Sequence, residues 1–194
     1  SHFEGWLDIS GTADLPTAQA KAEWAHFSGW KSWGYGKEPV WLKVEIPPAG
    51  FSDAEPFILI ARPTYLDSLT LYDPETGRVQ HSGDFNPPSN DAFSSLLFTF
   101  EVPALATSRH VFLKMQTTGS RVIYLSVMKR SAAWTHLRNV EWATGCVLLL
   151  SIFLLAWSLA EWWSTRDRLT GFYISKQLMS CLWGFMYSGF AWIT

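Results

Sequence analysis

The sequence predicts a mainly β protein, in which a jelly-roll β-sandwich is followed by a transmembrane helical hairpin. Residues 39–127 contain short alternating runs separated by Pro, Gly, Asn and Asp, the pattern of an all-β sandwich or jelly roll. Residues 142–160 carry no charge, and at about 1.5 Å per helical residue they span roughly 30 Å, the thickness of a bilayer's hydrocarbon core. Residues 172–194 form a second apolar run, in which Lys176 is the one charged residue.

Residues 1–130 are expected to form one domain with its own core. In residues 40–46 the apolar and polar positions alternate, which places them on opposite faces of a strand. One face holds Val40, Leu42, Val44 and Ile46, and the other holds Trp41, Lys43 and Glu45. Further strands are predicted at residues 57–61, 68–72, 96–102, 110–116 and 122–128. Only residues 16–27 look helical, and only as a short helix, and residues 29–36 are expected to be a glycine- and aromatic-rich loop.

Residues 131–194 are expected to hold the first two transmembrane helices, at about 140–162 and 170–194, of a longer polytopic protein. Tryptophans flank the first of them, as expected where a helix crosses the lipid headgroups: Trp134, Trp142, Trp157, Trp162 and Trp163. The link at residues 164–168 is short and basic, so the two helices must form a hairpin. The alternative is a buried helical pair in a soluble protein.

The basic link favours a cytoplasmic hairpin turn in a bacterial inner membrane, and therefore a periplasmic N-terminal domain. Lys129, Arg130 and Arg138 argue for the reverse, but the charge rule weakens when a folded domain is translocated. Export requires a signal peptide, which we expect ahead of Ser1. Residues 131–141 can continue the last strand as helix directly into the first span.

Composition excludes several classes of protein. The net charge of −2 does not favour nucleic acid as a partner. Both cysteines, Cys146 and Cys181, lie in the apolar runs, so the soluble domain has neither a disulfide nor a cysteine metal site. The five histidines are scattered, and the sequence shows no P-loop, GxSxG elbow, dinucleotide fingerprint or separated acid and base. No catalytic residue is therefore assigned.

Aromatic and cationic side chains on the polar strand faces indicate ligand binding. Trp41, Lys43, Tyr72 and Lys114 fall opposite the apolar faces of their strands. An aromatic side chain on a polar strand face is a usual means of stacking a sugar ring or anchoring a small ligand. The alternative is that the loop at residues 29–36 covers Trp41, which then only packs there.

Calcium is the main competitor to a sugar as the ligand, and no other cofactor is expected. This ion takes about six to eight oxygen ligands, largely carboxylates and carbonyls. Asp73, Glu75, Asp84 and Asp91 lie in neighbouring turns and could converge. Turns are also rich in Asp for local hydrogen bonding alone, and no EF-hand spacing is present.

Several motifs occur in a characteristic order: PVWLKV at residues 39–44, RPTYLDSLTLY at 62–72, GD at 83–84 and RHVFLKMQT at 109–117. The first apolar run and RDRLTGFY at residues 166–173 follow them. In this order they resemble bacterial receptors with seven transmembrane segments and diverse intracellular signalling modules, specifically their type 2 extracellular domain. That family usually has an arginine shortly after the GD element, whereas residues 85–92 hold none.

The resemblance covers nearly the entire chain and implies a jelly-roll sensor domain similar to carbohydrate-binding modules. It also implies seven membrane helices and a cytoplasmic output module, most often a diguanylate cyclase or a histidine kinase. Tyr65 and Asp67, which lie in the second motif, join the candidate ligand-binding residues.

We therefore expect the periplasmic input segment of a membrane-bound signalling receptor, which binds a small ligand such as a carbohydrate. The segment itself is expected to be no enzyme. Homodimers are expected because both implied outputs work as dimers. The alternative is a membrane-anchored carbohydrate-binding or adhesion module without signalling output, and a third option is an accessory domain of a transporter.

Overall fold

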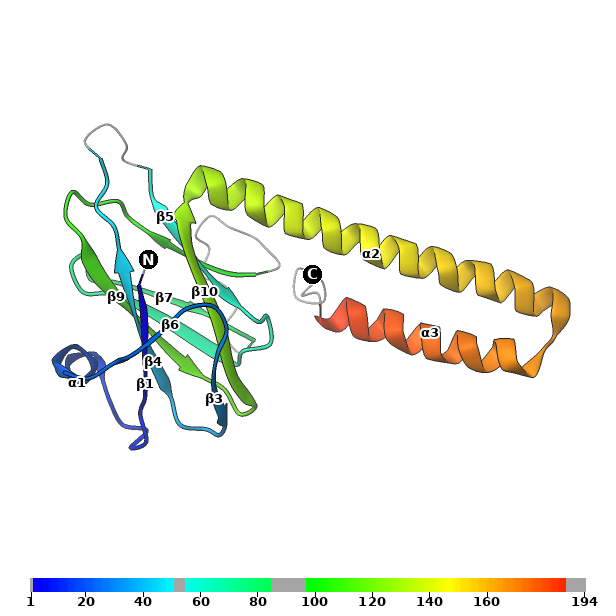
Figure 1. Cartoon of the computed structure of the whole chain (residues 1–194), viewed down its shortest axis with the longest axis horizontal. Coiled ribbons are helices and arrows are strands. Elements are labelled where there is room, and N and C mark those ends of the chain that lie inside the picture. The colour runs from blue at the N-terminus through cyan, green and yellow to red at the C-terminus, as the bar shows by residue number, and fades with distance from the viewer. Residues whose placement is uncertain (1, 51–54, 85–96, 188–194) are drawn as a thin grey trace. The chain divides into compact units, whose positions relative to one another are not determined.

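The structure, a computed structural model, describes residues 2–50, 55–84 and 97–187. The chain divides into two compact units, Ser1–Trp134 and Thr135–Thr194. Strands and one short helix build the first unit, and helices build the second (Figure 1).

The first unit consists of two antiparallel sheets. Its strands are β1 (Phe3–Leu7), β2 (Ala25–Phe27), β3 (Lys31–Tyr35), β4 (Val40–Ile46), β5 (Phe57–Arg62), β6 (Ser68–Asp73), β7 (Arg78–Ser82), β8 (Phe98–Val102), β9 (Arg109–Gln116) and β10 (Ser120–Lys129). The large sheet has six strands in the order β2-β1-β4-β9-β6-β7, and the small sheet has four in the order β3-β10-β5-β8. The β-sandwich is thereby confirmed, whereas a jelly roll as its specific topology stays a prediction.

The core lies between the two sheets and is made by the apolar face of each strand. On β4, Val40, Leu42 and Ile46 have no exposed surface, as the alternation of this strand predicts. Leu59 and Phe100 enter the same cluster from the small sheet. Each such side chain contributes about 1.5–3 kcal/mol by leaving water. The two sheets are therefore held together mainly by burial of apolar side chains.

Residues 29–36 differ from the expected loop, because Lys31–Tyr35 form strand β3. This strand pairs with β10, with a register shift between Ser120 and Val122. Trp33 packs against the core, whereas Trp30 and Tyr35 are exposed. Gly34 interrupts the strand pattern with a φ of 74°, a conformation that glycine adopts at little cost. That irregularity made the segment look like a loop in the sequence.

The short helix expected within residues 16–27 is present, although it begins at Leu15 and occupies only the first part of that range. Helix α1 spans Leu15–Ala20, and residues 25–27 form β2 instead. Asp14 caps the helix by accepting a hydrogen bond from the backbone N–H of Thr17, and a proline follows in the first turn.

Besides β2 and β3, two further strands, β1 and β7, were not predicted from the sequence. Gly5 interrupts the apolar pattern of β1, and a side chain there would collide with the ring of Trp33. In β7 the pattern is inverted, because Val79 is half exposed while Gln80 is buried. The Gln80 side chain bonds to the backbone N–H and C=O of Glu101 on β8 and so joins the edges of the two sheets.

A buried ion pair lies at one end of the sandwich. Arg109 donates to both carboxylate oxygens of Asp73, at 3.3 and 3.0 Å, and also to the carbonyl of Pro103. Both side chains are at most 2% exposed. Burial raises the pKa of Asp73, but hydrogen bonds from Arg109 and Thr76 outweigh this and hold the pKa below its ordinary value.

The second unit is a pair of helices. Helix α2 (Arg130–Thr165) begins in the first unit, and α3 (Arg168–Tyr187) follows a tight turn in which Arg166 has a φ of 52°. Asp167 accepts a hydrogen bond from the backbone N–H of Thr170 and so caps α3. The helices pack side by side along an apolar groove, lined by Gly145, Leu148, Leu149, Ile152, Leu155, Leu178, Cys181, Leu182 and Phe185.

Within the described residues, α2 is the one helix that is long and apolar enough to cross a membrane. Its most apolar 18-residue window has a mean hydropathy of 2.1. Helix α3 covers only part of the second predicted span, and residues 188–194 lie outside the described residues. The first span is thus a candidate by length and composition, and the second stays a prediction.

Replacing Arg109 with Ala should lower the free energy of unfolding by about 3–5 kcal/mol, because it leaves the Asp73 carboxylate buried and unpaired. Denaturant unfolding of the chain in detergent micelles measures this. The loss should shrink as pH falls, since an unpaired Asp73 regains stability once it is protonated.

The matched control replaces both partners, Arg109 with Met and Asp73 with Leu, and should retain most of the stability because no buried charge remains. A loss below about 1 kcal/mol in the single variant would show that the pair is solvated, as surface pairs are.

Candidate functional site

The outer face of the large sheet carries the side chains that strand alternation keeps out of the core. Antiparallel pairing sets His26 beside Glu4, and Glu4 beside Lys43. It also sets Glu45 beside His110. Side chains that are direct neighbours across two strands have Cβ atoms about 4.5–5.5 Å apart. The register of β2, β1, β4 and β9 therefore gathers residues that are far apart in the sequence.

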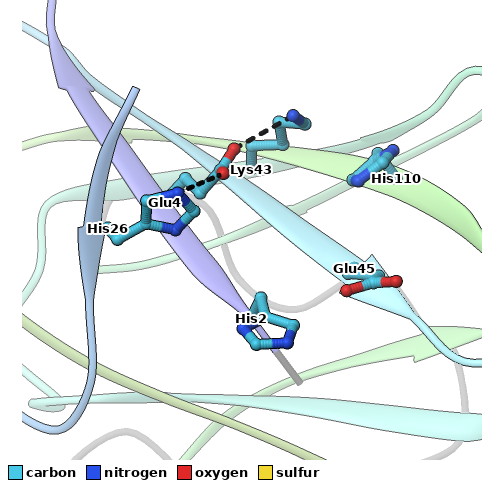
Figure 2. Close-up of a pocket in the computed structure, with 6 residues that line it drawn as sticks. All are labelled: His2, Glu4, His26, Lys43, Glu45 and His110. Atoms are coloured by element: carbon cyan, nitrogen blue, oxygen red, sulfur yellow. Dashed lines mark ion pairs between the residues drawn. The ribbon is translucent and has the colours of Figure 1, made fainter. Parts of the chain in front are cut away.

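These side chains line a hollow of about 290 Å³, which we call the polar hollow (Figure 2). Its lining residues are His2, Glu4, His26, Lys43, Glu45 and His110. The Glu4 carboxylate lies between two partners, 3.0 Å from Nζ of Lys43 and 3.2 Å from Nε2 of His26. This network fixes one wall of the hollow.

The opposite wall has two side chains that can bind a ligand, Glu45 and His110. Among the described residues, neither the Glu45 carboxylate nor the His110 imidazole has a hydrogen-bonding or charged side-chain partner. A carboxylate accepts hydrogen bonds, and an imidazole can donate and accept, so the two can bind the hydroxyl or amine groups of a small polar molecule. In the described part of the chain, no three His, Cys, Asp or Glu side chains are arranged to hold a metal ion.

A second group lies on the same face, and we call it the aromatic cluster: Trp6, Trp24, Trp41, Tyr72 and Phe112. Trp41 stacks on Tyr72, with ring centroids 5.6 Å apart and an interplanar angle of 30°. Nζ of Lys114 lies 5.3 Å from the centre of the Trp41 ring. The structure thus brings together three of the residues that the sequence proposed for ligand binding.

Trp41 is not open to solvent, because it is only 1% exposed. Its cover is not residues 29–36, as the sequence-based alternative supposed, but the segment that contains Ala13 and Ala18. We call residues 8–20, which include α1, the α1 cover. Sequence reasoning missed it because a loop and a helix of six residues give little hydrophobic pattern.

The other residues that the sequence predicted to bind ligand lie outside the aromatic cluster. Lys43 lies in the polar hollow, with its Nζ 6.0 Å from the centre of the Trp24 ring. Asp67 belongs to a separate turn, where it accepts hydrogen bonds from the backbone N–H and hydroxyl of Thr118. Tyr65, two residues earlier, is 40% exposed.

The proposed calcium ligands have different surroundings. Asp73 is engaged by Arg109, and Asp91 lies outside the described residues. Burial raises the pKa of Asp84, and the negative charge of Asp67 raises it further. Glu75 donates its backbone N–H to Asp73 within the same turn. Calcium binding by these turns remains a prediction.

Four residues of the polar hollow were not assigned to a site from the sequence: His2, Glu4, His26 and His110. Their spacing shows no motif, and only the pairing of strands puts them together. Glu45 was placed on the polar face of its strand, and the pairing of β4 with β9 gives it His110 as a neighbour.

Comparison with known proteins identifies the family. The model for the 7TMR-DISM extracellular 2 domain matches residues 1–129, which covers the whole sandwich up to the start of α2. The chain belongs to the 7TMR-DISM receptor family. A search of curated proteins found no match.

Membership confirms the resemblance seen in the sequence. In this 7TMR-DISM receptor chain, residues 1–129 are the extracellular sensor domain, and the candidate membrane-spanning helix α2 begins directly after it. The polar hollow and the aromatic cluster both lie within the sensor domain.

Replacing Asp84 with Asn should raise the melting temperature at neutral pH. Since the folded state raises the pKa of Asp84, holding this residue ionised costs stability above that pKa. The gain should disappear below about pH 4, the ordinary pKa of Asp, where the carboxyl is protonated in both the folded and unfolded states.

Thermal melts from acid to neutral pH, with and without millimolar calcium, measure this effect. Glu75→Gln is the matched control, because Glu75 is exposed in a nearby turn, and it should leave the melting temperature nearly unchanged. A stabilisation of the wild type by calcium that Asp84→Asn removes would instead support a calcium site.

Proposed function

We propose that this chain is the ligand-sensing input segment of a membrane-bound signalling receptor. The polar hollow carries this proposal, because it presents Glu45 and His110 without side-chain partners among the described residues of a sensor domain. A hollow with a few convergent polar groups is the usual form of a small-molecule site.

The direct link between the sensor domain and the membrane helix supports signalling. Strand β10 ends at Lys129 and α2 begins at Arg130, with no residue between them. The backbone N–H of Arg130 donates to the carbonyl of Pro56, and that of Ser131 donates to the Glu55 carboxylate. The first turn of α2 is thus anchored to the residues just before β5, so a change in the sandwich can alter the start of the helix.

The family and the basic link at residues 164–168 support a proposal for the location and output of the receptor. We propose that the domain lies in the bacterial periplasm, that α2 crosses the inner membrane, and that the receptor works as a homodimer. A cytoplasmic diguanylate cyclase or histidine kinase would then carry the output.

The proposed ligand is a small polar molecule, with a carbohydrate as the first candidate. Carboxylate and imidazole groups bind sugar hydroxyls through hydrogen bonds. A jelly-roll sandwich similar to carbohydrate-binding modules would fit such a ligand. Calcium is the competing candidate at the turns that hold Asp73, Glu75 and Asp84.

The alternative is a membrane-anchored carbohydrate-binding or adhesion module without output. The anchored first turn of α2 favours the sensor. Hydrogen exchange at residues 130–134 distinguishes the two, because a sensor should change the protection of these amides when ligand binds, and an anchor should not.

Replacing Glu45 or His110 with Ala should abolish ligand binding and leave stability nearly unchanged. Neither side chain has a described partner to lose, and substitutions of this kind usually alter stability by no more than about 0.5 kcal/mol. A thermal-shift screen of the chain in detergent micelles, with sugars and amino acids as probes, measures both effects, since a ligand specific for the folded state raises the melting temperature.

Glu23→Ala is the matched control, because Glu23 is exposed and does not line the polar hollow. It should keep the full ligand-induced shift. Retention of that shift in both the Glu45 and the His110 variants would remove the polar hollow from the proposal.

A further inference from the structure

The aromatic cluster holds a buried polar group that the fold leaves unsatisfied. Trp41 is 1% exposed, and its indole N–H has no acceptor among the described residues. Leaving a buried donor unpaired costs free energy, so such groups in folded proteins call for an explanation. An acceptor oxygen next to Trp41 would remove this cost.

Lys114, beside Trp41, also lacks a close oxygen. Its ammonium donates to the carbonyl of Ala13 at 3.5 Å, which is long for a hydrogen bond. Its other contact is the face of the Trp41 ring. A carboxylate is the strongest hydrogen-bonding partner for an ammonium group. Among the described residues none is hydrogen-bonded to Nζ of Lys114, and the Asp14 carboxylate acts on it only through its charge. The two neighbouring residues therefore lack the same kind of group, an acceptor oxygen.

The α1 cover fills the space above these groups with little apolar surface. Its buried apolar side chains are the methyl groups of Ala13 and Ala18, and Leu15 packs partly buried beside them. A helix of six residues is too short to be stable by itself. Two local devices keep its shape: the Asp8 carboxylate accepts from the backbone N–H groups of Ser10, Gly11 and Ala13, and Asp14 caps the helix.

We propose that the α1 cover occupies a ligand site and is displaced by a ring-shaped ligand that carries a carboxylate, the chemistry of a uronate sugar. The Ala13 and Ala18 methyls take the place of the apolar face of the ring on Trp41, and the Ala13 carbonyl takes the place of a carboxylate oxygen near Lys114. This inference rests on the proposed ligand-sensing function and names its ligand class and its regulation.

The displaced state joins the aromatic cluster to the polar hollow. Trp6 and Trp41 are cross-strand partners, two residues along β1 and β4 from the pair Glu4 and Lys43. Two residues along a strand correspond to about 6.6 Å. A single sugar unit can therefore stack on Trp41 while the next unit reaches the Glu4–Lys43 network.

The stability of the α1 cover determines the apparent affinity of the site for its ligand. A ligand that binds only the open form has an apparent affinity reduced by the fraction of chains that are open. A substitution that weakens the cover without touching the site should therefore tighten binding. Asp14 suits this purpose, because it is exposed and the described hydrogen bonds of its side chain go to Thr17 of the cover. Its charge also acts on Lys114, so a variant that removes only the charge is needed as a control.

Asp14→Ala removes the cap and the charge, and Asp14→Asn removes the charge but keeps a capping oxygen. Trigalacturonate is the probe, with galactotriose as its uncharged counterpart, and isothermal titration of the chain in detergent micelles gives the affinity. We expect Asp14→Ala to bind trigalacturonate about fivefold more tightly than the wild type, the factor that loss of a helix cap supplies. Asp14→Asn loses the charge that acts on Lys114 but keeps the cap, so it should bind trigalacturonate less tightly than Asp14→Ala.

Two further readouts test the site itself. Lys114→Gln and Trp41→Ala should each lose binding, and the Lys114 variant keeps the test valid if the loss of Trp41 prevents folding. Amides of residues 9–20 should exchange faster with trigalacturonate than without it, because the bound ligand holds the cover open. Galactotriose should bind more weakly than trigalacturonate, since it offers no carboxylate to Lys114.

Equal affinities of Asp14→Ala and Asp14→Asn would overturn the proposal, because the effect would then be one of charge and not of the cover. Trigalacturonate binding to no variant would overturn it as well. A further result would be a probe that stabilises the wild type and the Trp41 and Lys114 variants but not the Glu45 and His110 variants. That result would overturn this inference, and the proposed function would remain supported. A thermal-shift screen in which no probe raises the melting temperature would overturn both this inference and the proposed function.

Discussion

The antiparallel pairing of β4 with β1 on one side and β9 on the other is the constraint on which the rest of the structure depends. Alternation along β4 sends Val40, Leu42 and Val44 into the core and sends Trp41 and Lys43 to the outer face. A slip of one residue would exchange the two faces. The same register that closes the core therefore builds the polar hollow and the aromatic cluster.

Polar side chains hold the sandwich together where apolar packing ends. Arg109 and Asp73 pair inside one end, and Gln80 bonds to the backbone of Glu101 across the sheet edges. Arg121 donates to the Glu38 carboxylate and to backbone carbonyls of β3. The bonds from Gln80 to Glu101 and from Arg109 to the Pro103 carbonyl connect the large sheet to β8 or the residue that follows it. They are directional, unlike apolar burial, so they fix how the two sheets lie on each other. A fixed arrangement is what a sensor needs if a change in one sheet is to reach the other.

The candidate site lies on one sheet, and the candidate membrane-spanning helix α2 follows a strand of the other sheet. The polar hollow lies on β1, β2, β4 and β9 of the large sheet, whereas β10, which leads into α2, belongs to the small sheet. In the proposed function, a ligand signal crosses the core through side chains such as Leu42, Leu113 and Leu125, which pack in one cluster. Close-packed cores transmit small displacements because they have little free volume. This arrangement makes the core part of the proposed signalling route and not only a source of stability.

The sequence by itself determined the sandwich class, six of the strands, the first membrane-span candidate and the family, because alternation and long apolar runs are local patterns. It did not determine β3 or β7, where Gly34 and the buried Gln80 break the pattern. Only the tertiary structure decided that Glu4, His26 and His110 meet, since strand order and register are not local properties. It also decided that α1 covers Trp41, because a short helix gains its place from the surface on which it packs.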